Sequence, residues 1–126
     1  MPKVSRESAS QGGDFGPVSD RSDEIEGYSV NFTTFHFDLD QSAVLKGLPN
    51  DECQCPHWGY VVKGSMTMRC GDREEVLNAG DAYYLAPGHV GISNEPGTEV
   101  VQFSPADELR KTSEVIMKNM QAAQGG

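Results

Sequence analysis

Three residues that commonly bind transition metals lie within five positions of this sequence. Cys53, Cys55 and His57 occupy alternate positions in the segment Cys-Gln-Cys-Pro-His. In an extended chain, alternate side chains point to the same side about 6.6 Å apart, so two thiols with this spacing can converge on one ion. Pro56 favours a loop that leads into a strand, and a bend in that loop brings His57 closer to the thiols.

A fourth ligand has to come from another part of the chain. His89 is the best candidate, because it directly follows a Pro-Gly turn signal. The alternative interpretation assigns no metal to the two cysteines, since a buried free cysteine behaves as a small hydrophobic residue. Redox sensing by the same pair is disfavoured, because Asp51 and Glu52 work against a reactive thiolate.

Short segments with the composition of β-strands surround these residues. Turn signals such as Lys63-Gly64 and Pro96-Gly97 separate the segments. Many short strands at this spacing predict an antiparallel sandwich or barrel. The predicted strands cover residues 28–37, 58–63, 65–70, 74–77, 82–86 and 98–103.

The two ends of the chain differ in composition from the predicted barrel, which we place at residues 25–104. Residues 1–24 are rich in Ser, Gly, Asp and Arg, so they are predicted to form a flexible N-terminal arm. Near the other end, Ser104 and Pro105 are typical of a helix start, and apolar residues then recur at helical spacing. We therefore predict an amphipathic helix over residues 105–120 that packs on the barrel.

The composition excludes several classes of function. The chain has 126 residues, with 10 Lys and Arg against 19 Asp and Glu, for a net charge of −9. This length fits one domain. The negative charge argues against nucleic-acid and membrane-surface partners, because both require clustered basic residues. Three cysteines and the lack of a long apolar segment predict a cytoplasmic protein without a membrane span.

Two segments resemble the signature motifs of the cupin superfamily. The first is His57-Trp-Gly-Tyr-Val-Val-Lys-Gly64, and the second is Gly80-Asp-Ala-Tyr-Tyr-Leu-Ala-Pro-Gly88. The resemblance covers about residues 30–104. The chain also resembles a subgroup of small bacterial cupin-domain proteins. The resemblance implies an all-β fold, the double-stranded β-helix or jelly-roll barrel, with a C-terminal α-helix. It also implies a homodimer, with any metal at the barrel mouth between the motifs.

The residues at the four positions where cupins usually bind metal are altered. In the first motif, the two His positions fall on Asp51 and Cys53, and the Glu position falls on His57. In the second motif, the His position falls on Gly91, and His89 lies two residues earlier. Either the site is rebuilt or the barrel binds organic ligands without a metal. Soft sulfur with imidazole favours zinc or iron(II), and the rebuilt site would comprise Cys53, Cys55, His57 and His89.

Two functions follow from these interpretations. The first is a small cupin-domain protein that acts as a metal-dependent enzyme on a small organic substrate, with the metal as a Lewis acid. The second is a non-catalytic ligand-binding or sensor module without metal, because a barrel mouth holds small ligands and the fold alone does not specify chemistry. A site closed by four protein ligands would weaken the catalytic interpretation, since catalytic zinc sites keep an open position.

Overall fold

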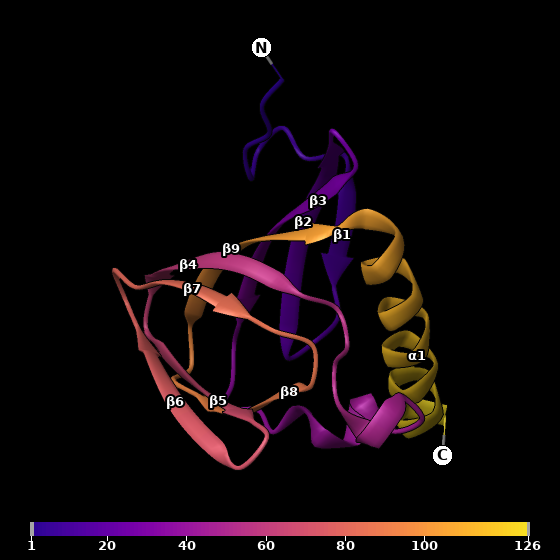
Figure 1. The fold of residues 1–126 in the computed structure, drawn as a ribbon. Coiled ribbons are helices and arrows are strands. Elements are labelled where there is room, and N and C mark those ends of the chain that lie inside the picture. The colour runs from indigo at the N-terminus through magenta and orange to yellow at the C-terminus, as the bar shows by residue number, and fades with distance from the viewer. Residues whose placement is uncertain (1, 126) are drawn as a thin grey trace.

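The chain folds into two facing antiparallel sheets and one C-terminal helix (Figure 1). The structure is a computed structural model that describes residues 2–125. Its elements are the strands β1 (Gln11–Asp14), β2 (Val18–Ile25), β3 (Tyr28–Phe35), β4 (His57–Lys63), β5 (Ser65–Cys70), β6 (Arg73–Asn78), β7 (Ala82–Leu85), β8 (His89–Asn94) and β9 (Thr98–Pro105), the 3₁₀ helices η1 (Gln41–Leu45) and η2 (Pro49–Asp51), and the helix α1 (Ala106–Gly125).

The larger sheet has the strand order β1-β2-β3-β9-β4-β7, and the smaller sheet has the order β6-β5-β8. This arrangement confirms the predicted jelly-roll barrel with a C-terminal helix. Burial alternates along β4, where His57 and Val61 are buried while Trp58 and Tyr60 are half exposed. Successive side chains of a strand point to opposite faces, so this alternation separates the barrel interior from its outside.

Apolar side chains from both sheets pack together in the interior of the barrel. None of these side chains is more than 9% exposed, and together they remove a continuous apolar surface from water. The cluster is made by Val61, Met66, Met68, Leu77, Tyr83, Leu85 and Val100.

The prediction of a flexible arm over residues 1–24 is wrong from Gln11 onward. Residues 11–14 and 18–25 form the hairpin β1–β2, and β2 pairs with β3 from Val18↔Phe35 to Ile25↔Tyr28. The sequence of β2 is rich in Ser, Asp and Glu, which have low strand propensity. Pairing with β3 on one edge and β1 on the other compensates for this weak propensity, since the two ladders satisfy backbone hydrogen bonds on both edges of the strand. The barrel strands therefore begin well before residue 25.

The C-terminal helix covers a second, smaller apolar cluster at one end of the barrel. It begins at Ala106 and runs to Gly125, so the predicted range 105–120 is correct within one residue at its start and too short at its end. Leu109 and Ile116 pack against buried residues of η1 and of the loop before β4. Asn119 Nδ2 also donates to the carbonyl oxygens of Val44 and Lys46 at 2.8 Å, which fixes η1 against the helix. No helix within residues 2–125 is apolar enough over a sufficient length to span a bilayer.

Candidate metal site and cavity

The two motif segments meet where the loop before β4 touches the start of β8. Cys53 N–H donates to the carbonyl oxygen of His89 at 2.9 Å, and Gly88 N–H donates to that of Cys53 at 2.8 Å. The first residue of β4, His57, pairs with Leu85 at the end of β7. These backbone contacts place side chains from both motifs at one point in the barrel wall.

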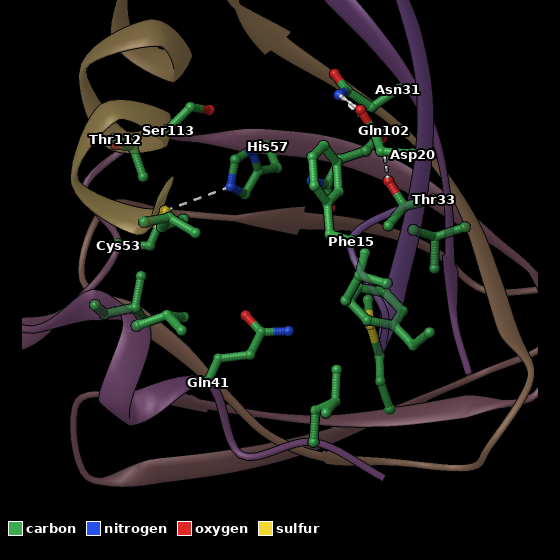
Figure 2. A pocket seen from close by; sticks show the side chains of 18 of the residues that line it. Phe15, Asp20, Asn31, Thr33, Gln41, Cys53, His57, Gln102, Thr112 and Ser113 are labelled. Atoms are coloured by element: carbon green, nitrogen blue, oxygen red, sulfur yellow. Dashed lines mark hydrogen bonds between the residues drawn. The ribbon is translucent and has the colours of Figure 1, made fainter. Parts of the chain in front are cut away.

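Cys53, His57 and His89 form a compact group of potential metal ligands. One ligand atom from each residue lies within 4.8 Å of the others, and all three residues are buried. Cys53 Sγ lies 3.5 Å from His57 Nε2, and the two imidazole rings are 4.9 Å apart between their centroids. Figure 2 shows the thiol of Cys53 and the ring of His57 directed toward each other at one side of the cavity.

Hydrogen bonds to the second ring nitrogens fix the orientation of both imidazoles. His89 Nδ1 donates to the backbone carbonyl of Ala86 at 2.7 Å, and His57 Nδ1 lies 2.6 Å from Ser104 Oγ. The Ala86 carbonyl can only accept, so it selects the His89 tautomer that leaves Nε2 free to bind a metal. The Ser104 hydroxyl orients the His57 ring and can act as donor or acceptor. Ser104 therefore has a different role from the predicted helix cap, because β9 continues through Pro105 and the Ser104 hydroxyl reaches His57.

The buried environment keeps both imidazoles neutral near pH 7. Burial, with a smaller contribution from His89, lowers the pKa of His57 to about 3. Burial also lowers the pKa of His89, against opposing effects of the Ala86 carbonyl and Glu52. The pKa of the Cys53 thiol is raised, again mainly by burial. Neutral imidazoles are ready ligands, whereas the thiol must lose its proton when a metal binds.

The structure leaves Cys55 outside this group, although the sequence pattern included it among the ligands. Cys55 is 1% exposed, and its Sγ–H donates to the carbonyl oxygen of Pro56 at 3.6 Å. Burial raises the pKa of the Cys55 thiol to about 12, with further contributions from Cys53 and Glu108. Cys55 thus belongs to the apolar cluster under α1, and the group directed into the cavity has three members.

Cys53, His57 and His89 line a cavity of about 330 Å³ inside the barrel. The helix α1 and η1 supply one side of the cavity, and the inner faces of β2, β3 and β9 supply the opposite side. Phe15, in the turn between β1 and β2, also lines the cavity. The N-terminal hairpin is therefore part of the cavity wall, which the prediction of a flexible arm had missed.

A polar network lies across the cavity from the metal-ligand group (Figure 2). The carboxylate of Asp20 accepts hydrogen bonds from Asn31 Nδ2 at 3.0 and 3.2 Å and from Thr33 Oγ1 at 2.8 Å. Strand register explains the arrangement, since Asp20 is paired with Thr33, and Asn31 is paired with Gln102. The sequence offered no signal for this network beyond the alternation of Asn31 and Thr33.

The charge of Asp20 makes the stability of the protein depend on pH. Burial raises the pKa of Asp20 above its ordinary 3.8, although the hydrogen bonds from Thr33 and Asn31 oppose the rise. The folded state therefore binds this proton more tightly than the unfolded state, and the contribution of Asp20 to the free energy of unfolding falls as pH increases above about 3.8. Asp20→Asn lacks this titration. In urea unfolding, the free energy of unfolding of the variant minus that of the natural protein should therefore increase from pH 4 to pH 7. A difference that stays constant with pH would contradict the assignment.

Comparisons with known proteins identify the fold. No family model matches the sequence, and no curated protein matches it. An RmlC-like cupin from Shewanella frigidimarina has 17% identity and a TM-score of 0.57 over 83% of this chain and 92% of that one. The polyketide cyclase RemF from Streptomyces resistomycificus has 17% identity and a TM-score of 0.57 over 83% and 79%. KdgF from Halomonas sp. has 19% identity and a TM-score of 0.52 over 71% and 82%.

These similarities confirm the prediction of a cupin, made from the two sequence motifs, at the level of the fold. Sequence identities below 20% do not transfer an activity or a ligand set to this chain. The function has to be argued from the residues that line the cavity.

Proposed function

We propose that this protein is a small cupin that holds one divalent transition metal through Cys53, His57 and His89 and uses it to act on a small organic molecule. The compact arrangement of three ligand atoms at the cavity wall carries the proposal. One thiolate and two imidazoles suit zinc or iron(II). Three protein ligands would leave a coordination position for substrate, as in catalytic zinc sites, and all three residues line the cavity.

The residues around the proposed metal would have different roles. A bound zinc ion or iron(II) would supply Lewis-acid chemistry to an oxygen of the substrate. Ala86 and Ser104 hold the imidazoles in the orientation that binds a metal. The apolar side chains of Leu45, Leu109 and Ile116 lie around the ligands and exclude water from one side of the site.

Metal titration of the purified natural protein tests this proposal. After chelator treatment and buffer exchange, the protein should bind one equivalent of zinc with release of a proton near pH 8, because the thiol of Cys53 must ionise. Isothermal titration in two buffers of different ionisation enthalpy gives the stoichiometry and the number of protons. Binding of less than about 0.1 equivalent of both zinc and iron(II) would reject the metal centre.

A non-catalytic binding or sensor module without metal is the second candidate. It is favoured by the contact between Cys53 Sγ and His57 Nε2, since this hydrogen bond satisfies the thiol without any ion. The same titration distinguishes the two candidates. A protein that binds small ligands but no metal would have the second function.

We also propose a homodimer that buries the outer face of the larger sheet. Trp58 is directly opposite Tyr84 on β7 and Phe103 on β9, and its ring contacts Tyr84 at 4.9 Å and Tyr28 at 6.2 Å between centroids. These four aromatic residues are each 42–53% exposed, so they form a contiguous apolar patch that is unusual for a monomer. A second copy can cover the patch with the same residues about a two-fold axis.

Replacing Trp58 with Ser tests the dimer, because the indole is the centre of the aromatic patch. The natural protein should sediment as a dimer at micromolar concentration, and the variant should dissociate at least about tenfold more readily. Val76→Ser, on an exposed face of the smaller sheet, is the control and should remain dimeric. A natural protein that sediments only as a monomer would contradict the proposal.

The three cysteines are free thiols. Free thiols persist in a reducing compartment, so we propose a cytoplasmic location for the protein.

A further inference from the structure

The end of the cavity opposite the metal ligands contains a carboxylate that is held in place by hydrogen bonds. Asp20 receives three of these bonds from Asn31 and Thr33, as described above. Ser29 Oγ donates to Asn31 Oδ1 at 2.7 Å, which turns the amide nitrogen of Asn31 toward Asp20. A carboxylate has about four acceptor positions. One position of Asp20 therefore remains for a donor inside the cavity.

Gln102 supplies a hydrogen-bond donor in the same part of the lining, because it is paired with Asn31, whose amide binds Asp20. The phenol of Tyr83 donates to Gln102 Oε1 at 2.6 Å, so Gln102 presents its amide nitrogen on the other side. Gly59 makes this contact possible, since a Cβ at that position would collide with the Tyr83 ring and hydroxyl. Both Asp20 and Gln102 line the cavity. Among the hydrogen bonds of the described residues, none is donated by this nitrogen. Since no buried side-chain nitrogen or oxygen there lacks a partner, the nitrogen is accessible rather than buried.

The rest of the lining restricts the charge of the ligand. None of the described residues that line the cavity is a Lys or an Arg, and most are apolar, including Phe15, Phe35, Leu39, Met68 and Val100. An anionic group at this end of the cavity would be desolvated beside Asp20 without a counter-charge, which is strongly unfavourable. A hydrocarbon body with a neutral polar group matches the lining better.

From these contacts we infer that the cavity takes an apolar alcohol or phenol, whose hydroxyl lies between Asp20 and Gln102. The hydroxyl donates to the free acceptor position of Asp20 and accepts from the amide of Gln102, so its donor and acceptor are both matched. A primary amine would satisfy Asp20 but would offer Gln102 no acceptor once protonated. This inference rests on the proposed function in one respect: the end of the bound molecule that reacts is the end that faces Cys53, His57 and His89.

Three naphthalene probes test the hydroxyl site. An apolar cavity of about 150 Å³ holds benzene, so about 330 Å³ has room for a two-ring compound. 2-Naphthol carries the hydroxyl, 2-methoxynaphthalene lacks the donor, and 2-naphthoate is anionic. Chelator-treated protein, followed by naphthalene fluorescence, should bind 2-naphthol at least tenfold more tightly than either of the other probes.

Variants assign this selectivity to named side chains. In Asp20→Asn the preference for 2-naphthol over 2-methoxynaphthalene should fall to less than about threefold. Asp23→Asn is the control with the same change of charge on the same strand, because the Asp23 carboxylate bonds Ser10 and does not line the cavity; it should keep the preference. Gln102→Glu retains an acceptor for Tyr83 but loses the amide donor, and it should weaken 2-naphthol binding at least fivefold.

Repeating the binding measurements with added zinc separates this inference from the metal centre. If zinc does not bind but the preference for 2-naphthol holds, only the proposed metal centre fails. If zinc binds and the natural protein holds all three probes equally, the hydroxyl site is wrong. Absence of 2-naphthol binding at millimolar concentration, or a preference that Asp20→Asn leaves unchanged, would also overturn it.

Discussion

Replacing either His57 or His89 with Ala is expected to reduce bound zinc from one equivalent to less than about 0.1 equivalent at micromolar protein. Each variant leaves two of the three ligands that lie within 4.8 Å of one another. Even loss of a residue that only orients a ligand lowers metal affinity by about 10–100-fold, so loss of a ligand itself should cost more. Elemental analysis after dialysis against micromolar zinc measures the effect.

Two controls make this experiment specific. His36→Ala removes an exposed imidazole whose Nε2 contacts Ser19 Oγ at 2.7 Å, outside the cavity lining. Cys55→Ala removes the buried thiol that the structure places outside the ligand group. Both should retain a full equivalent of zinc, while circular dichroism verifies that all four variants fold. Full zinc occupancy in His89→Ala would remove that residue from the site.

Replacing Leu45 with Ala is expected to have the largest effect on stability outside the strands. Leu45 is 2% exposed and lies in the apolar cluster with Cys53, Cys55 and Val90, against the α1 residues Leu109 and Ile116. Removing a buried leucine side chain costs about 2–5 kcal/mol, because the transfer energy is lost and a cavity remains. The melting temperature should fall by roughly 6 to 25 °C.

Val76→Ala is the comparison for this measurement, since Val76 is 58% exposed on β6. Its loss of stability should stay below about 1 kcal/mol, which is the range of strand propensity. Urea unfolding of both variants, followed by tryptophan fluorescence, gives the two free energies. Equal losses in the two variants would show that the contact between η1 and α1 contributes little to stability.

Local sequence patterns were sufficient to predict most of the barrel. Strand-like composition between turn signals predicted β3, β4, β5, β6, β7 and β9. The same pattern failed for β2, whose Ser and Asp residues form a strand only through pairing with β3. It also missed β8, a short strand that contains a glycine in its middle.

The metal-ligand group was predictable to a similar extent. The spacing of Cys53, Cys55 and His57 with the turn before His89 indicated the part of the chain where the structure groups Cys53, His57 and His89, since those residues are close in sequence or next to a recognised turn. Which cysteine faces the cavity depends on the backbone pairing of Cys53 with His89, and spacing contains no information about that contact. Asp20 and Gln102 line the same cavity only through the register of β2, β3 and β9, so no local pattern could relate them.

X-ray absorption spectroscopy at the zinc edge of the zinc-loaded natural protein tests the metal centre most directly. The first shell should contain one sulfur at about 2.3 Å and two imidazole nitrogens at about 2.0 Å, with oxygen in the remaining position. Addition of an alcohol or a carboxylate should alter only the oxygen contribution. Two sulfur ligands would mean that Cys55 joins the site and closes it, and a shell of oxygen alone would mean that Cys53, His57 and His89 do not bind the metal.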